Sequence, residues 1–467
     1  MTVERVVVLH TNDLHSHFEN IPKIRRYLQH TRKKLEQEQV TVITVDLGDA
    51  MDRVHPYTEA TDGKINIKLM NQIGYDAVTI GNNEGIGNSH QQLTDLYTQA
   101  NFPVVVDNLL DRTTGKPPKW TCQSKIIVTQ AGTKIGLLGC TAPFAATYDM
   151  NDWQALAVDQ VLPQQVQALA AKTDYIILLS HLGINWDRKI AHEYPQIDLI
   201  LGSHTHHLLE TGEQVGQTLL CAAGKWGQYV GQATLTFDKH QLKSAQAKVI
   251  KTEDLPEQVG DQVEIANYQQ MGEKLLQRFK VANLPTELNA AWQSTSPLMQ
   301  ATLAAIEQLT GTDLAILNGG LFLGDLHQGI VTRNDLHRIL PHPMRVVKVR
   351  LNGYNLWRLI REMEKNRNHL RNAIVKGNGF RGKIFGELVY AGIKFDSADK
   401  MVMINNHPIN LSADYEIATV DNFIYCPYFP TLEIAGHAKY WGDRFLRDIL
   451  GDYLADLYPI RKEQGVE

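Results

Sequence analysis

Five short apolar segments in the first 206 residues each end in residues that can bind a metal ion. The segments are Arg5–His10, Thr41–Asp46, Asp76–Ile80, Tyr175–Leu179 and Ile197–Leu201. Runs of Val, Ile and Leu of this length, bounded by glycine, are typical of strands that are buried on both faces. The stretches between them are mostly long enough for crossover helices, and in open α/β layers ligands bind beyond the carboxyl ends of the strands. The sequence therefore predicts an α/β domain with a binding site at that edge.

The residues after these segments are carboxylates, an amide and imidazoles. In chain order they are Asp13, His15, Asp49, Asn82, His181, His204 and His206. Two pairs are spaced i and i+2, and an extended backbone would turn both members of each pair to the same side. Such ligands suit Mn²⁺, Zn²⁺ or Fe²⁺ and argue against Ca²⁺. Because seven ligands exceed the needs of one tetrahedral ion, the sequence predicts two divalent ions that share a carboxylate and clamp a phosphoryl group.

Length and composition limit the class of protein. A chain of 467 residues suggests two or three domains, and its 43% hydrophobic and 21% charged residues are those of a soluble globular protein. The net charge of −5 gives no general attraction to nucleic acid or to an anionic membrane, so neither is an expected partner. No apolar stretch approaches the roughly 20 residues that span a bilayer, and no signal-peptide pattern opens the chain, so we expect a cytoplasmic enzyme.

The cysteines are widely separated and form no CxxC motif. They are Cys122, Cys140, Cys221 and Cys426. This spacing favours buried free thiols over disulfides or a zinc cluster.

The motifs at the five segment ends, taken together, resemble those of a known family. They are HTNDLHSH at 10–17, GD at 48–49, GNNE at 81–84, SHLG at 180–183 and GSHTHH at 202–207. In this order they resemble the calcineurin-like metallophosphoesterases, specifically the 5′-nucleotidase branch. The resemblance implies a four-layer αββα metallophosphoesterase domain and a C-terminal α+β domain of the 5′-nucleotidase type. We place the first domain at 1–250, a linker with a helix at 251–285 and the substrate-binding domain at 286–467.

The resemblance also assigns the ligands to two ions. One ion would be held by Asp13, His15, Asp49 and His206, and the other by Asp49, Asn82, His181 and His204. Asp49 would then be the bridging carboxylate that the number of ligands requires.

The sequence departs from the family pattern beside the third segment. The family has GNHE followed by an Asp, and that His and Asp form a dyad beside the phosphate. Here Asn83 replaces the His and Ile86 stands where the Asp would be. An amide can donate a hydrogen bond to a phosphoryl oxygen but cannot deliver a proton, and general acid–base help is worth about 10²–10⁴-fold. Asn83 is therefore the candidate catalytic residue, and His17, His207 and His342 are candidate substitutes for the missing acid.

In the resembling enzymes the C-terminal domain supplies a nucleoside pocket. Asn318 and Gly320 match the family's NGG turn, and Tyr390 and Phe423 stand near the positions of two aromatics that stack on the base. These four are the predicted substrate-binding residues, although YCPYF at 425–429 replaces the family's GGDGY loop.

The sequence thus predicts a two-metal phosphoesterase that hydrolyses a nucleotide or a related phosphorylated metabolite. One alternative is a phosphodiesterase or pyrophosphohydrolase acting on 2′,3′-cyclic nucleotides or UDP-sugars, whose leaving groups need less protonation. Another is a catalytically weak binding protein that keeps the metals but has lost the dyad.

Overall fold

The computed structural model describes residues 3–375, 377 and 379–460. The chain divides into two compact units, Met1–Gly272 and Glu273–Glu467. The division falls in helix α9 (Asp261–Gln277), which lies inside the segment 251–285. In the first unit, the start of α9 is paired with α1 (Ile21–Gln37): Arg25 contacts Glu264 at 2.8 Å, and Arg26 contacts Asp261 at 2.5 Å.

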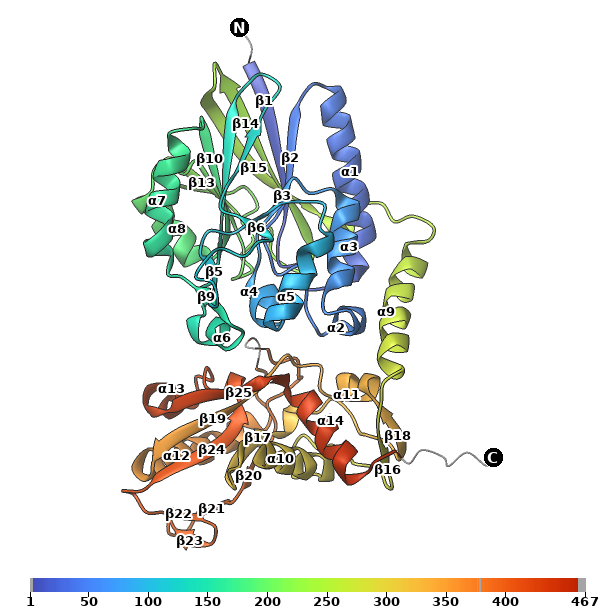
Figure 1. The fold of residues 1–467 in the computed structure, drawn as a ribbon, viewed down its shortest axis with the longest axis vertical. Coiled ribbons are helices and arrows are strands. Elements are labelled where there is room, and N and C mark those ends of the chain that lie inside the picture. The colour runs from blue at the N-terminus through green and yellow to red at the C-terminus, as the bar shows by residue number, and fades with distance from the viewer. Residues whose placement is uncertain (1–2, 376, 378, 461–467) are drawn as a thin grey trace. The chain divides into compact units, whose positions relative to one another are not determined.

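Two mixed sheets form the centre of the first unit (Figure 1). The first has the order β15 (Gln241–Lys251), β14 (Tyr229–Asp238), β1 (Val3–Thr11), β2 (Thr41–Asp46), β3 (Ala77–Val78), β4 (Val104–Val105) and β6 (Thr121–Cys122). The second has the order β12 (Glu213–Val215), β13 (Thr218–Cys221), β11 (Leu199–Gly202), β10 (Tyr175–His181), β8 (Lys134–Thr141) and β7 (Lys125–Val128). Strands β1 to β6 of the first sheet, and β13, β11, β10 and β8 of the second, pair in parallel, so their carboxyl ends share one edge.

Alternating side chains of the strands build three separate cores. Along β1, Val6 and Val8 pack between the two sheets, whereas Val7 packs under the helices on the outer face. Along β10, Ile177 packs between the sheets and Ile176 packs under the opposite helices. The covering helices are α1 and α3 (Lys64–Ile73) on the first sheet and α7 (Val158–Ala170) and α8 (Ile184–Glu193) on the second. This confirms the predicted αββα layers.

Short elements complete the first unit. They are α2 (Pro56–Ala60), α4 (Asn82–Ile86), α5 (His90–Leu96) and α6 (Ala145–Met150), with the small pair β5 (Leu109–Asp111) and β9 (Trp153–Ala155).

The second unit is an α+β structure, as predicted. Its main sheet has the order β20 (Leu388–Ala391), β17 (Ala315–Asn318), β24 (Asp414–Val420), β19 (Arg345–Asn352) and β25 (His437–Phe445). Its helices are α10 (Pro297–Thr310), α11 (Arg333–Ile339), α12 (Gly353–Leu370), α13 (Pro430–Ala435) and α14 (Leu446–Leu457). Two small sheets are formed by β16 (Lys280–Leu284) with β18 (Gly329–Thr332), and by β21 (Ile393–Asp396), β22 (Met401–Ile404) and β23 (His407–Pro408). A large hydrophobic core joins the main sheet to its helices.

All four cysteines are unpaired; three are buried and Cys122 is half-buried, as the free-thiol prediction requires. Among the helices of residues 3–375, 377 and 379–460, none has both the length and the apolar character needed to cross a bilayer.

Candidate metal centre

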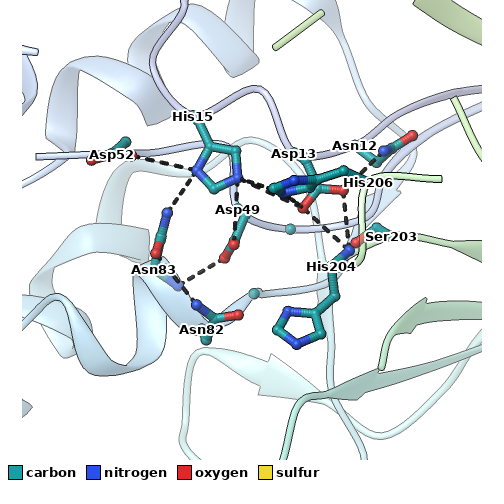
Figure 2. Close-up of polar contacts among 12 residues, drawn as sticks. Asn12, Asp13, His15, Asp49, Asp52, Asn82, Asn83, Ser203, His204 and His206 are labelled. Atoms are coloured by element: carbon teal, nitrogen blue, oxygen red, sulfur yellow. Dashed lines mark hydrogen bonds and ion pairs between the residues drawn. The ribbon is translucent and has the colours of Figure 1, made fainter. Parts of the chain in front are cut away.

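The loops that follow the parallel strands of both sheets bring the predicted ligands to one place (Figure 2). Asp13 and His15 follow β1, and Asp49 follows β2. Asn82 is the first residue of α4, which follows β3 after a short loop. His181 is the last residue of β10, and His204 and His206 follow β11. Both sheets therefore contribute to a common site.

Most of these loops have an unusual backbone. Five ligand candidates have φ angles in the left-handed region: Asp13 (49°), His15 (47°), Asp49 (52°), His204 (73°) and His206 (58°). This region is disfavoured for residues other than glycine and persists where surrounding contacts impose it. The contacts include Asp13 N–H to the Gly48 carbonyl at 3.1 Å and His15 N–H to the Asp49 carbonyl at 2.9 Å. The extended geometry predicted for the two i, i+2 pairs is therefore wrong, and tight turns bring these residues together instead.

One group of ligand atoms is formed by Asp13, His15 and His206, all within 4.8 Å of one another. His15 Nε2 lies 3.2 Å from His206 Nε2 and 3.8 Å from Asp13 Oδ1, and His206 Nε2 lies 3.5 Å from the same oxygen. Two imidazole nitrogens and a carboxylate that converge in this way suit a divalent first-row ion.

A second group is formed by Asp13, Asp49 and His181. His181 Nε2 lies 3.4 Å from Asp49 Oδ2. Neither this nitrogen nor the buried Oδ1 of Asn82 has a hydrogen-bond partner among the described residues. Because an unsatisfied buried polar atom costs about 1–3 kcal/mol, these two atoms indicate an ion that they would bind. The residues present therefore fit two divalent ions.

Asp13 belongs to both groups, and Asp49 of the second group also faces the first. Asp49 Oδ2 is 3.7 Å from His15 Nε2 and 3.4 Å from His181 Nε2, which is the placement a bridging carboxylate needs. His204 belongs to neither group: its backbone N–H donates to the Asp13 carboxylate at 3.1 Å, and its ring centroid lies 5.2 Å from that of His181. Its part as a ligand stays a prediction.

The charges of the site compensate one another. Burial by itself opposes protonation of His181, but the Asp49 and Asp13 carboxylates outweigh it and raise the pKa of His181 to about 10. Burial likewise opposes ionisation of Asp49, yet His181 and His15 hold the pKa of Asp49 below its ordinary value. Burial and the neighbouring His181 lower the pKa of His204 to about 4. The positive charge of a protonated His181 therefore compensates the Asp49 and Asp13 carboxylates, as a bound cation would.

Several supporting residues escaped the sequence reasoning. The buried Glu84 carboxylate accepts the backbone N–H groups of Asp49 (2.9 Å), Gly81 (2.8 Å) and Met51 (3.0 Å), which fixes the loop that carries Asp49. Asn12 donates to the Asp13 carboxylate at 2.9 Å, and Ser203 Oγ lies 2.6 Å from His181 Nδ1. Glu84, Asn12 and Ser203 each lie within one of the five motifs, next to or near a predicted ligand in the sequence. This closeness in sequence is the signal that could have identified them.

Asn83 lies at the site but is engaged with other residues. Its backbone N–H donates to Asp49 Oδ1 at 2.7 Å, and its side-chain Nδ2 lies 2.7 Å from His15 Nδ1 (Figure 2). Asp52 Oδ2 lies 3.6 Å from the same ring nitrogen. Ile86 ends α4 and, being aliphatic, supplies no acid.

The candidate substitutes for the missing acid are also engaged. His342 is buried in the second unit, with Nε2 2.6 Å from the Leu321 carbonyl oxygen and Nδ1 accepting the Arg381 N–H. His17 Nδ1 lies 2.6 Å from Glu19, and His207 Nδ1 lies 2.9 Å from Thr205 Oγ1.

The four predicted substrate residues do not form an exposed pocket. Phe423 is fully buried, with its ring 5.6 Å from those of Phe385 and Phe429. Asn318 and Gly320 are also buried, and both donate to the Phe385 carbonyl. Tyr390 is half-buried with the Arg367 guanidinium 5.1 Å from its ring centre.

Comparison with known proteins agrees with this geometry. Residues 6–208 match the model of the calcineurin-like phosphoesterases, and residues 277–425 match that of the 5′-nucleotidase C-terminal domain. The uncharacterized metallophosphoesterase YunD of Bacillus subtilis is 37% identical over 466 residues, covering 97% of this chain and 99% of YunD. The chain belongs to the calcineurin-like metallophosphoesterase family.

This metallophosphoesterase has the two-domain architecture of the 5′-nucleotidases. The 5′-nucleotidase of Vibrio cholerae is 23% identical over 524 residues, covering 98% of this chain and 91% of that protein. The structure of the NAD nucleotidase of Haemophilus influenzae shares the fold, with a TM-score of 0.65 at 17% identity and coverage of 98% and 97% of the two chains. Membership of the family makes the chain a phosphoric ester hydrolase, and calcineurin-like phosphoesterases use a dinuclear metal centre.

Proposed function

We propose that this metallophosphoesterase hydrolyses a nucleotide or a related phosphorylated metabolite with the help of two divalent ions. The observation that carries the proposal is the pair of ligand groups joined by Asp13, with Asp49 placed between His15 and His181. When bound, two such ions neutralise charge on a phosphoryl group and activate water for in-line attack.

The protein's own residues fix the geometry of that chemistry. Asp13 and Asp49 are buried and held by backbone N–H groups, so their oxygens point in set directions. His15, His181 and His206 act as ligands rather than as bases, because their Nε2 atoms face the carboxylates. Ligands fixed in advance reduce the reorganisation needed in the transition state.

The substrate class is drawn from the relatives. The names of the similar proteins, 5′-nucleotidase and NAD nucleotidase, refer to nucleotides, and we carry this class over to the present chain. Phe423 packs in a core, so in this conformation it offers no face to a base, whereas Tyr390 is only half-buried. A cytoplasmic location remains part of the proposal.

A second candidate is hydrolysis of a phosphodiester or a pyrophosphate, such as a cyclic nucleotide or a nucleotide-sugar. Asn83 favours it, because the side chain at the position of the family's acid cannot deliver a proton to the leaving group. Diesters and anhydrides with acidic leaving groups depend less on that proton, which is worth about 10²–10⁴-fold for poor leaving groups.

The test is turnover by purified protein stripped of metal and reloaded with Mn²⁺, Zn²⁺, Fe²⁺ or Co²⁺. We expect metal-dependent hydrolysis, faster for p-nitrophenyl phosphate or bis-p-nitrophenyl phosphate than for alkyl monoesters, and then a nucleotide, a cyclic nucleotide or a nucleotide-sugar as the preferred substrate in a panel. D49N should abolish it, whereas D107N, which alters a buried carboxyl that accepts the Gly139 N–H, should not. Two bound ions without turnover of any ester would contradict the proposal and favour a metal-containing binding protein.

A further inference from the structure

The first unit exposes two aromatic side chains, and both lie beside the candidate metal centre. Among the Phe, Tyr and Trp residues of the described part of this unit, residues 3–272, Phe144 is 44% exposed and Trp226 is 36% exposed, whereas the others are buried or half-buried. The Phe144 ring centre lies 5.6 Å from that of His204, and the Trp226 N–H donates to the Asp13 carbonyl at 2.6 Å. Binding sites for small molecules are lined mainly by apolar and aromatic side chains, so both residues are candidates for contact with a substrate.

The Trp226 ring already has partners within the protein. The His17 ring stacks on it with the two centres 4.6 Å apart, and the Lys225 ammonium nitrogen lies 4.0 Å from its centre. The Trp226 carbonyl also accepts the side-chain N–H of Asn20 at 2.8 Å. Trp226 therefore has the stacking and cation–π partners that a ligand would otherwise supply.

Phe144 lacks such partners. Among residues 3–375, 377 and 379–460, His204 supplies the one ring that it contacts, at an interplanar angle of 56°, and no cation lies over it. The Phe144 ring thus keeps an apolar surface that nothing in the described chain covers, directly beside a predicted ligand.

The backbone of Phe144 is held by the strand before it and the helix after it. β8 ends at Thr141, which pairs with His181 of β10, so the loop leaves the sheet beside a ligand candidate. The Phe144 carbonyl accepts the Tyr148 N–H at 3.0 Å, at the start of α6. Tyr148 is buried, and its hydroxyl lies 3.0 Å from Thr141 Oγ1, which ties the helix back to the end of the strand. Phe144 is therefore fixed at the carboxyl edge of the second sheet, where ligands of such sheets bind.

The helix that follows Phe144 also packs against α4, which begins at Asn82. The Asn151 side chain at the end of α6 donates to the Ile86 carbonyl at 3.2 Å. A Cβ on Gly85 would come 2.2 Å from the Tyr148 hydroxyl oxygen, so the two helices are in close contact. The segment around Phe144 is thus anchored next to two residues of the predicted ligand set, His181 and Asn82.

The position of the ring limits what it can do in the proposed reaction. The ring centres of His181, His204 and Phe144 follow one another at 5.2 and 5.6 Å, so Phe144 lies outward of the second ligand group. Two ions bind the phosphoryl group of an ester, and its organic group extends away from them. An apolar ring cannot stabilise the phosphoryl charge, but it can cover the face of a ring in that organic group.

We propose that Phe144 is a specificity-determining residue, whose exposed ring packs against the organic ring that the ester carries beside its phosphoryl group. In a nucleotide this ring is the sugar, and in an aryl phosphate it is the aryl group. The inference rests on the proposed function, because it requires the phosphoryl group to bind at the two ions. It assigns part of the choice of substrate to the first unit.

Binding of two phosphonates to protein loaded with Mn²⁺ tests the proposal without turnover. Phenylphosphonate and methylphosphonate offer the ions the same charged group and differ in the ring, and titration calorimetry gives both dissociation constants. We expect the wild type to bind phenylphosphonate at least about fivefold more tightly than methylphosphonate, and F144A to lose this preference. F144Y keeps the ring and should keep the preference.

I126A is the matched control. Ile126 is also an exposed apolar residue of the second sheet, but it pairs with Gly136 near the start of β8, at the opposite end of the strand from Phe144. I126A should therefore show the preference of the wild type. Because Phe144 contacts His204, F144A is also titrated with Mn²⁺, and its affinity for the ions should match that of the wild type.

The same preference in F144A as in the wild type would overturn the proposal. So would an equal loss of affinity for both phosphonates, which is the result expected if Phe144 only supports His204. If F144A does not fold, F144L decides, because it keeps an apolar side chain without the flat ring and should show a smaller preference than the wild type.

Two outcomes separate this inference from the proposed function. If the loaded wild type binds neither phosphonate, the phosphoryl site is refuted and the role of Phe144 with it. A ring preference that depends on Phe144, without hydrolysis of any ester, would support the role of Phe144 and contradict the proposed hydrolysis alone.

Discussion

Binding of an ion at His181 should release a proton, and the structure sets the size of the effect. In the protein without ions, Asp49 and Asp13 overcome the effect of burial and raise the pKa of His181 to about 10, so the ring is protonated at neutral pH. An ion that binds through Nε2 must displace that proton. From pH 7 to the pKa near 10, at about 1.4 kcal/mol per unit, the displacement costs about 4 kcal/mol. Displacement of this proton alone should therefore raise metal affinity about tenfold per pH unit in this range.

Calorimetric titration with Mn²⁺ at pH 7 in Pipes and in Tris, which differ in ionisation enthalpy, counts the protons released. We expect between one and two, because the nearby carboxylates also raise the pKa of His15 against the effect of burial. H192Q, at an exposed histidine on α8, should release the same number, and H181Q about one fewer. Buffer-independent heats together with an affinity that is flat from pH 7 to 9 would refute the reasoning.

Three further predictions concern stability and the loop that carries Asp49. Because the folded pKa of His181 lies above the unfolded value of about 6.5, the metal-stripped protein should lose stability as pH rises from there towards 10, measured by urea unfolding. E84Q places an NH₂ group against one of three backbone N–H donors and should lower the free energy of unfolding by about 2–3 kcal/mol in the same measurement. E36Q, at an exposed position, should leave it unchanged. An unchanged unfolding midpoint for E84Q would show that this carboxylate does not hold the loop. G81A would put a Cβ 2.0 Å from Asp49 Oδ1 and should abolish binding of at least one ion. G324A, whose Cβ would meet only Ile339 at 3.9 Å, should bind metal normally. Metal content after dialysis measures both variants, and full occupancy in G81A would contradict the predicted close contact.

The αββα layers and most of the ligand candidates could be predicted from the sequence because both follow from local rules. Buried runs of Val, Ile and Leu ended at carboxylates and imidazoles, and parallel strands must bring such ends to one edge. Five of the seven predicted ligands have their binding atoms in the two groups. The third segment was the least accurate: β3 comprises Ala77–Val78 rather than Asp76–Ile80, and the Asp76 side chain before it accepts the Thr44 N–H and pairs with Arg32.

Other features depend on contacts that no local pattern contains. The left-handed turns at Asp13 and His15 are imposed by hydrogen bonds to the loop after β2, so an argument from strand periodicity could not find them. The sequence alone does not distinguish an aromatic residue that stacks on a ligand from one that fills a core. Phe423 is buried in a core. The contact of Asp52 Oδ2 with His15 Nδ1 at 3.6 Å joins residues that are far apart in the chain, and no local pattern predicts it.

The ligands come from two sheets that are made at different times during synthesis. The predicted ligands up to Asn82 follow strands of the first sheet, and the other ligands, from His181 to His206, follow strands of the second sheet. A nascent chain must therefore extend past residue 206 and pack one sheet on the other before a complete set of ligands exists. Ion binding is thus expected late in folding, after the two sheets have packed correctly. Bound ions would then oppose separation of the two sheets.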